Sequence, residues 1–178
     1  MHTTKSGKLI TVYDDLLTYS QRQDIYAFAT KSLFKIGWAD GNIIENQQYK
    51  YLHSAYNEED VARLGIVGML NGTEAGKELI DYKVKYCMLN LSTASDINFV
   101  HSHPEDKVVL YYVNLEWQDG WHGETLFFSE DQKSIEFASP YTPGRIIAFD
   151  AKIPHTIRPQ SSLSSQFRFT LALVLEKC

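Results

Sequence analysis

The sequence has 178 residues, of which 44% are hydrophobic, and it carries a net charge of −5 at neutral pH. This length and hydrophobic share suit one compact domain with a sizeable core. The acidic balance and the lack of a Lys/Arg-rich run argue against nucleic acid or an anionic membrane surface as a partner. The first residues have no apolar signal-peptide core, and no run of about eighteen apolar residues is present to span a membrane. We therefore expect a cytoplasmic protein.

The two cysteines are predicted to be free thiols. Cys87 lies within an apolar run and Cys178 is the last residue. Two such cysteines do not form a disulfide framework of the kind found in small secreted domains.

Helical patterns occupy the first part of the chain. Apolar residues recur at every third or fourth position over residues 19–32, which predicts an amphipathic helix that Ser20 can cap. A second helix is expected over residues 61–70, with acids in its first turn and an Asn-Gly stop. Residues 37–59 show no clean period, and we interpret them as a long surface loop beside the functional face.

Strand patterns dominate the remainder of the chain, where β-branched and aromatic residues alternate with charged ones. Turn residues separate these runs from one another. The predicted strands cover residues 9–13, 79–91, 97–103, 108–114, 125–128, 135–138, 145–149, 155–158 and 167–175. Many short strands after a helical start predict an α+β fold that is mainly β, an antiparallel sandwich or barrel buttressed by helices.

The segment Asn-Phe-Val-His-Ser-His-Pro-Glu carries the main chemical signal. In a strand, His101 and His103 would face the same side, about 6 to 7 Å apart. Two such imidazoles can bind one metal if a third ligand comes from elsewhere, and His155 is the best candidate. Glu105 shares the same parity and can offer a carboxylate.

The order of these parts resembles the 2-oxoglutarate- and Fe(II)-dependent dioxygenases, specifically the prolyl 4-hydroxylase-like branch. The motifs that carry the resemblance are His101-x-His103, Leu110 to Asn114, Trp117, Gly123-Glu124-Thr125, Pro143-Gly144-Arg145, Phe149, His155 and Arg168-Phe169-Thr170. The resemblance implies a double-stranded β-helix, a cupin-like jelly roll, with its core over about residues 79–175. Residues of about 14–75 would form the helical support within one oxygenase domain of residues 1–178.

The resemblance also implies a set of site residues and cofactors. Fe(II) would be bound by His101, His103 and His155. The cosubstrate 2-oxoglutarate would be held by Arg168, Thr170 and Tyr112, since an arginine offers a planar fork that binds a carboxylate bidentately. Phe167, Phe169 and the leucines that follow indicate that Arg168 is buried.

The implied reaction is hydroxylation of an unactivated C–H bond, with dioxygen consumed and 2-oxoglutarate converted to succinate. By the same resemblance the substrate would be a prolyl residue of a protein or peptide, or else a small molecule. No oligomeric state follows from the sequence.

One position departs from the family pattern, in which an acid follows the first histidine by two residues. If His101 takes the family's histidine position, His103 replaces the acid. If His103 takes it, Glu105 supplies the carboxylate and the ligands become His103, Glu105 and His155. Both registers remain open, and the first is preferred because the second leaves little chain before the next strand.

Two other classes of function compete with the oxygenase interpretation. A non-catalytic jelly-roll module that binds a metal or small ligand would explain the missing acid. A zinc-dependent hydrolase is the other alternative, because histidine sites also suit zinc and Glu105 is available as a base. Among the remaining polar and aromatic residues, we expect His122 to be exposed, Glu124 to hold a turn, Arg158 to lie on the surface, and Trp38, Trp117 and Trp121 to pack.

Overall fold

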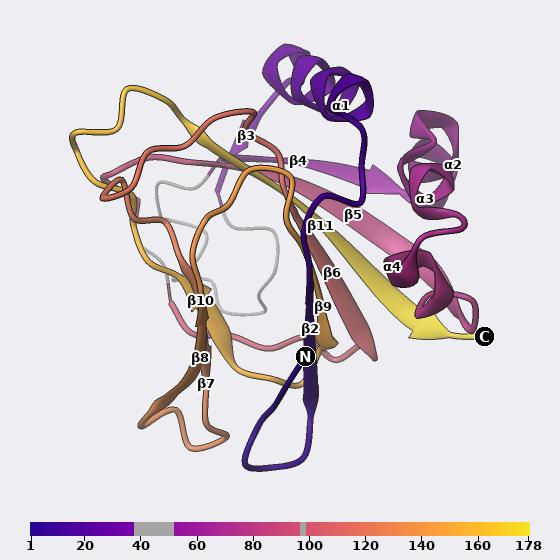
Figure 1. Ribbon diagram of the computed structural model, residues 1–178, viewed down its shortest axis with the longest axis vertical. Coiled ribbons are helices and arrows are strands. Elements are labelled where there is room, and N and C mark those ends of the chain that lie inside the picture. Colours follow the sequence, from indigo (N-terminus) through magenta and orange to yellow (C-terminus); the bar gives the residue numbers. More distant parts are fainter. Residues whose placement is uncertain (38–51, 97–98) are drawn as a thin grey trace.

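The computed structural model describes residues 1–37, 52–96 and 99–178. Within them, helices lie on one side of a large antiparallel sheet and a small sheet lies on the other (Figure 1). The described helices are α1 (Tyr19–Lys31), α2 (Glu58–Leu64), α3 (Ile66–Leu70) and α4 (Glu74–Lys77).

The large sheet has eight strands in the order β1-β2-β9-β6-β11-β5-β4-β3, and the small sheet has three in the order β10-β7-β8. Every neighbouring pair in both sheets is antiparallel. The strands are β1 (His2–Thr3), β2 (Leu9–Tyr13), β3 (Lys35–Ile36), β4 (Leu52–Asn57), β5 (Tyr82–Ser92), β6 (Lys107–Tyr112), β7 (Thr125–Phe128), β8 (Ile135–Ser139), β9 (Ile146–Asp150), β10 (His155–Ile157) and β11 (Arg168–Lys177). This mainly antiparallel architecture confirms the predicted fold class.

Two hydrophobic cores result from the alternation of side chains along the central strands. On β11, Phe169 and Leu171 belong to the core between the large sheet and the helices. Ala172 and Val174, on the opposite face of the same strand, pack in the core between the two sheets. β11 therefore contributes apolar side chains to both cores, as β6 and β9 also do. The face of β11 toward the small sheet carries the candidate site.

The predicted first helix is confirmed, but its N-cap lies two residues earlier than expected. The N-cap of α1 is Thr18, not Ser20, and the side chains of Thr18 and Gln21 form a reciprocal capping box. The second predicted helix is divided into α2 and α3, because Gly65 between them adopts a left-handed conformation with φ of +67°.

The strand predictions agree with the structure in β2, in β5 and after residue 104, to within a few residues at each end. Two expectations are wrong. Residues 52–57 form β4, whereas 37–59 was expected to be a loop; β4 pairs with β5 along its whole length, a long-range partner that local sequence does not reveal. Residues 38–51 of that predicted loop, including Trp38, lie outside the described residues.

The predicted strand over 97–103 is the second error. Of its described part, residues 99–103, only His101 pairs, through an isolated bridge to His155, and residues 97–98 lie outside the described part. The expectation failed because Pro104 has no backbone donor to extend a ladder and because the segment passes from one sheet to the other.

Two further properties of the chain concern cysteine and membranes. Cys87 and Cys178 are both free, as predicted; the first is buried and the second exposed. Within the part of the chain that the structure describes, no helix has the length and apolar character needed to cross a membrane.

Candidate functional site

The segment that carries His101 and His103 connects the two sheets. The backbone N–H of His101 donates to the carbonyl of His155 in β10, and the N–H of His155 donates back to His101, at 3.0 and 2.8 Å. Two residues later, the N–H of His103 donates to the carbonyl of Ala151, just beyond β9 of the large sheet, at 2.8 Å. Backbone hydrogen bonds to both sheets therefore fix the positions of all three histidines.

These three histidines form one cluster. His101, His103 and His155 each offer one ligand atom, and the three atoms lie within 4.8 Å of one another. Nitrogens bound to a common ion at 2.0–2.1 Å are separated by at most about 4 Å, so small side-chain rotations close the set around one metal. His101 is half-buried, while His103 and His155 are buried.

Hydrogen bonds to backbone carbonyls orient two of the rings. The Nδ1 atoms of His101 and His155 lie 3.2 Å from the carbonyl of Phe99 and 2.8 Å from that of Ile153. With a proton on Nδ1, each ring donates to its carbonyl and keeps the lone pair of Nε2 available for a metal. The local sequence produces both contacts in the same way, because each carbonyl belongs to the residue two positions before its histidine.

Burial favours the neutral form of His103 and His155. Burial lowers the pKa of His155 well below the usual range, and the neighbouring His101 and His103 lower it further. Burial also lowers the pKa of His103, with a smaller opposing effect from Glu105. Neutral imidazole is the form that binds metals.

Arg168 lies at the first position of β11 and is fully buried, as the sequence predicted. Its Nε donates to the carbonyl of Gly123 at 2.9 Å, and its Nη1 donates to the hydroxyl of Thr170 at 2.5 Å. The guanidinium carbon lies 4.5 Å from the ring centre of Tyr141 and 5.3 Å from that of Tyr112. Aromatic faces and neutral acceptors thus hold a permanent cation inside the protein.

Tyr112 lies beside this arginine, but its hydroxyl donates to Thr125 in β7 at 2.6 Å. Its ring stacks on Tyr141 at 4.5 Å. The sequence predicted no site role for Thr125 or Tyr141, because nothing local distinguishes a threonine or tyrosine beside the site from one that packs elsewhere. Thr125 lines the cavity described below, whereas Tyr112 does not.

A single cavity of about 50 Å³ contains both groups of residues, which is room for several water molecules or a small ligand. Its walls come from β5, β6, β7, β10 and β11 and from the segment before β6. Its lining consists of Met88, Asn90, Phe99, His101, His103, Val108, Leu110, Thr125, His155, Thr156, Ile157, Arg168, Thr170, Ala172 and Val174. The histidine cluster and the arginine therefore face one shared space.

Glu105 does not belong to this cavity lining or to the cluster of ligand atoms. It is buried, and one carboxylate oxygen accepts from the ammonium group of Lys85 at 3.0 Å. Lys85 also pairs with Glu176 at 2.8 Å. The sequence left two possible sets of metal ligands open. The structure brings together the set of three histidines and leaves Glu105 outside it.

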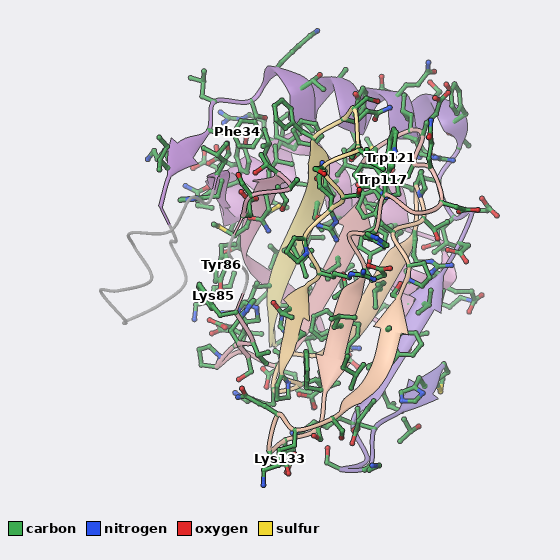
Figure 2. The ribbon with its side chains drawn as sticks, turned by 90° about the vertical axis from the view of Figure 1, so that its left-hand side faces the viewer. Phe34, Lys85, Tyr86, Trp117, Trp121 and Lys133 are labelled. Carbon is green, nitrogen blue, oxygen red and sulfur yellow. The ribbon has the colours of Figure 1, made fainter. Side chains whose placement is uncertain are left out.

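The residues expected to be peripheral behave accordingly. Trp117 and Trp121 pack edge to face at 5.2 Å, near the end of the molecule that carries α1 and away from Lys133 at the opposite end (Figure 2). The side chain of His122 is 39% exposed, and Glu124 forms an ion pair with Arg158 at 3.5 Å. None of them lines the cavity.

The donor set fits a divalent transition metal, because imidazole nitrogen suits iron, zinc, copper and nickel.

No protein-family model matches the sequence, and no curated protein matches it. Solved structures do match over nearly the whole chain. A prolyl-4-hydroxylase from Pseudomonas putida has a TM-score of 0.63 at 13% identity and covers 97% of this chain and 95% of its own. A 2OG-Fe(II) oxygenase family oxidoreductase from Burkholderia pseudomallei has a TM-score of 0.63 at 13% identity. The match covers 97% of this chain and 86% of the Burkholderia chain.

The chain has the fold of the 2-oxoglutarate- and Fe(II)-dependent oxygenases.

The same oxygenase fold occurs in proteins described by different reactions. The non-haem α-ketoglutarate-dependent carbocyclase SnoK from nogalamycin biosynthesis matches with a TM-score of 0.68 at 11% identity, covering 96% of this chain and 80% of its own. Several of the other similar structures are prolyl hydroxylases. At these identities the likeness establishes the double-stranded β-helix, and the reaction has to be argued from the residues of the site.

Proposed function

We propose that this chain is an Fe(II)- and 2-oxoglutarate-dependent dioxygenase that hydroxylates an unactivated C–H bond. One observation carries the proposal: a cluster of three histidines and a fully buried arginine face the same cavity inside an oxygenase fold. A structural metal site has no need of a cation in the same cavity, whereas a keto acid that chelates the metal needs one for its second carboxylate.

In this proposal, His101, His103 and His155 hold Fe(II) through their Nε2 atoms. Bound together there, Fe(II) and 2-oxoglutarate would supply the activation of dioxygen, in a reaction that converts dioxygen, 2-oxoglutarate and the C–H substrate to succinate, carbon dioxide and the hydroxylated product. Three protein ligands would leave the metal open to further ligands, as oxygenase chemistry requires. The carbonyl partners of His101 and His155 keep the ring planes fixed when the ligands exchange.

Arg168 would bind the distal carboxylate of 2-oxoglutarate. The hydrogen bonds from Arg168 to Gly123 and Thr170 fix the guanidinium before the ligand arrives, which reduces the entropy lost on binding. Thr170, on the same face of β11, adds a hydroxyl to the same region. Tyr112 would support the arginine through its ring, since its hydroxyl is engaged by Thr125.

The apolar side chains of the cavity would exclude water from the reaction. Val108 and Leu110 on β6 and Ala172 and Val174 on β11 give apolar walls to the cavity that the histidines and Arg168 also line. A wall of this kind lowers the local dielectric constant, which strengthens the interaction of a buried carboxylate with Arg168.

A prolyl residue of a protein or peptide is the first substrate class to test, because several similar structures are prolyl hydroxylases, one of them in complex with a peptide fragment. The similarity to a carbocyclase makes a small molecule the second class. Both would be screened by succinate formation in the presence of dioxygen.

The hydrolase alternative has less support, since it requires a general base beside the metal-bound water. No aspartate or glutamate lines the cavity among the described residues. Glu105, the base that the sequence offered, is engaged by Lys85.

The proposal is tested by anaerobic titration of the Fe(II)-loaded protein with 2-oxoglutarate, following the visible charge-transfer absorption that bidentate chelation produces. We expect the band in the wild-type protein, no band in His155→Ala because metal is lost, and an affinity for 2-oxoglutarate at least a hundredfold lower in Arg168→Met. Arg158→Met is the matched control, because Arg158 is a surface arginine outside the cavity. A metal-loaded wild-type protein without the band would refute the proposal.

A further inference from the structure

The part of the cavity wall that comes from β5 carries a sulfur atom. Met88 is buried, with 5% of its surface exposed, and it lines the same cavity as the three histidines and Arg168. Its Cα partners on the neighbouring strands are Ala172 of β11 and Ala55 of β4. The small side chains on both sides leave room beside the flexible thioether, which therefore faces the site without being tightly enclosed by its strand neighbours.

The other sulfur atoms of the chain lie elsewhere. Because side chains alternate along a strand, the adjacent Cys87 packs in the core between the large sheet and the helices. Met69 in α3 packs against that same core, and Met1 is 86% exposed. Cys178 is exposed at the end of the chain. Among the described residues that line the cavity, Met88 is therefore the one that contains sulfur.

A thioether is the most easily oxidised group on this wall. Its sulfur accepts an oxygen atom through a lone pair, and no bond has to break. The aliphatic lining residues offer only strong C–H bonds. The ring of Phe99, whose centre lies 6.3 Å from that of His101, would have to lose its aromatic conjugation during attack. An oxidant generated inside the cavity therefore has Met88 as its preferred target when no substrate occupies the space.

We propose that Met88 is a self-oxidation site, which the protein converts to methionine sulfoxide during turnover without substrate. The inference rests on the proposed function, which supplies 2-oxoglutarate and dioxygen. One oxygen atom of dioxygen is transferred to the sulfur of Met88, and the other enters succinate as 2-oxoglutarate loses carbon dioxide. The sulfur and the keto acid each lose two electrons, which together are the four that reduce dioxygen, and Fe(II) is regenerated. The product places a polar group in an apolar part of the wall.

The test compares two oxidants by mass spectrometry of peptides. One sample is the Fe(II)-loaded protein with 2-oxoglutarate and air, with catalase present to remove peroxide. The other is the metal-free protein with hydrogen peroxide. Trypsin releases residues 86–107 as one peptide, and its fragmentation distinguishes Cys87, Met88 and Phe99. A sulfoxide adds the mass of one oxygen atom, about 16 Da.

We expect the two oxidants to act in opposite orders. Turnover should oxidise Met88 at least fivefold faster than Met1, because the oxidant forms inside the cavity. Peroxide should oxidise Met1 at least fivefold faster than Met88, because Met1 is exposed and Met88 is buried. Succinate in place of 2-oxoglutarate cannot be decarboxylated and should abolish the oxidation of Met88. The same rate with succinate would mean ordinary metal-catalysed damage and would overturn the inference.

Two variants check which residue receives the oxygen atom. Met88→Leu keeps the size and apolar character of the side chain and should lower the mass gain of the 86–107 peptide at least tenfold. Met69→Leu is the matched control, because Met69 packs in the other core, and it should leave the gain unchanged. An undiminished gain in Met88→Leu, or a wild-type gain located at Phe99 or Cys87, would refute the assignment.

Succinate measured in the same samples separates this inference from the proposed function. If wild-type protein forms succinate from 2-oxoglutarate while Met88 gains no oxygen, self-oxidation is refuted and the proposed function stands. If the metal-loaded protein forms no succinate and Met88 stays unoxidised, both are refuted.

Discussion

Alanine at position 123 would push on the buried guanidinium of Arg168 without changing any residue that lines the cavity. Gly123 has a φ of +86°, and a Cβ placed there would lie 3.1 Å from Cδ and 3.2 Å from Nε of Arg168. These distances are tighter than ordinary van der Waals contact, so the arginine side chain must move by a few tenths of an ångström. The hydrogen bond from its Nε to the carbonyl of residue 123 would be distorted by the same movement.

Gly120 provides a matched control for the backbone effect. Its φ is +83°, nearly the same as that of Gly123, but a Cβ there meets nothing within 4 Å. Each alanine costs about 1–2 kcal/mol for the left-handed conformation, which lowers the melting temperature by about 2–8 °C for a chain of this size. Any additional loss in Gly123→Ala reports the contact with Arg168.

The functional effect is the sharper measurement. Weakening one charge-assisted hydrogen bond costs about 1.5–3 kcal/mol, so we expect Gly123→Ala to bind 2-oxoglutarate at least tenfold more weakly than Gly120→Ala. The assay is the same anaerobic titration of Fe(II)-loaded protein. Equal affinities in the two variants would mean that the position of Arg168 does not control cosubstrate binding, and the assigned anchor would then be wrong.

Two further predictions concern thiol reactivity and acid stability. Burial raises the pKa of the Cys87 thiol to about 12, so a thiol reagent should label only Cys178 in the native protein and both cysteines in denaturant; fast labelling of two thiols without denaturant would contradict the buried position. Although burial alone would raise the pKa of Glu78, hydrogen bonds from Tyr13 and Lys107 lower it below its usual value of 4.5. The ionised carboxylate therefore stabilises the folded protein at pH values above about 4.5, and this contribution is lost as the pH falls through the lower pKa of the folded state. Glu78→Gln should cost about 1 kcal/mol of stability at neutral pH and flatten the acid limb of the plot of stability against pH. Parallel acid limbs in the variant and the wild type would exclude this role.

The burial of Arg168 shows how a correct expectation can rest on a partly wrong reason. The sequence indicated burial from the apolar residues on both sides and from the leucines at 171, 173 and 175. In the structure those leucines face the helices, in the other core. Arg168 shares its face with Thr170 and Ala172 and is buried because the small sheet and the aromatic rings of Tyr112 and Tyr141 cover it.

The histidine cluster could be anticipated in membership but not in geometry. The spacing of His101 and His103 predicted one shared face on a strand, and the structure instead has a single bridge between His101 and His155. The three rings converge because the segment hydrogen-bonds to both sheets at once. Such a crossing depends on residues distant in the chain, which a local pattern does not encode.

By itself, the sequence determined the strand-rich character, most of the strand positions, the first helix and the free state of both cysteines, and it singled out the three histidines that the structure brings together. These features depend on local alternation, turn residues and composition, which act over a few neighbours. The tertiary structure alone decided that β4 joins the large sheet, that the hydroxyl of Tyr112 is used by Thr125, and that Glu105 pairs with Lys85 outside the cavity. Each of these depends on pairing between segments far apart in sequence, where the partner, and not the residue itself, determines the outcome.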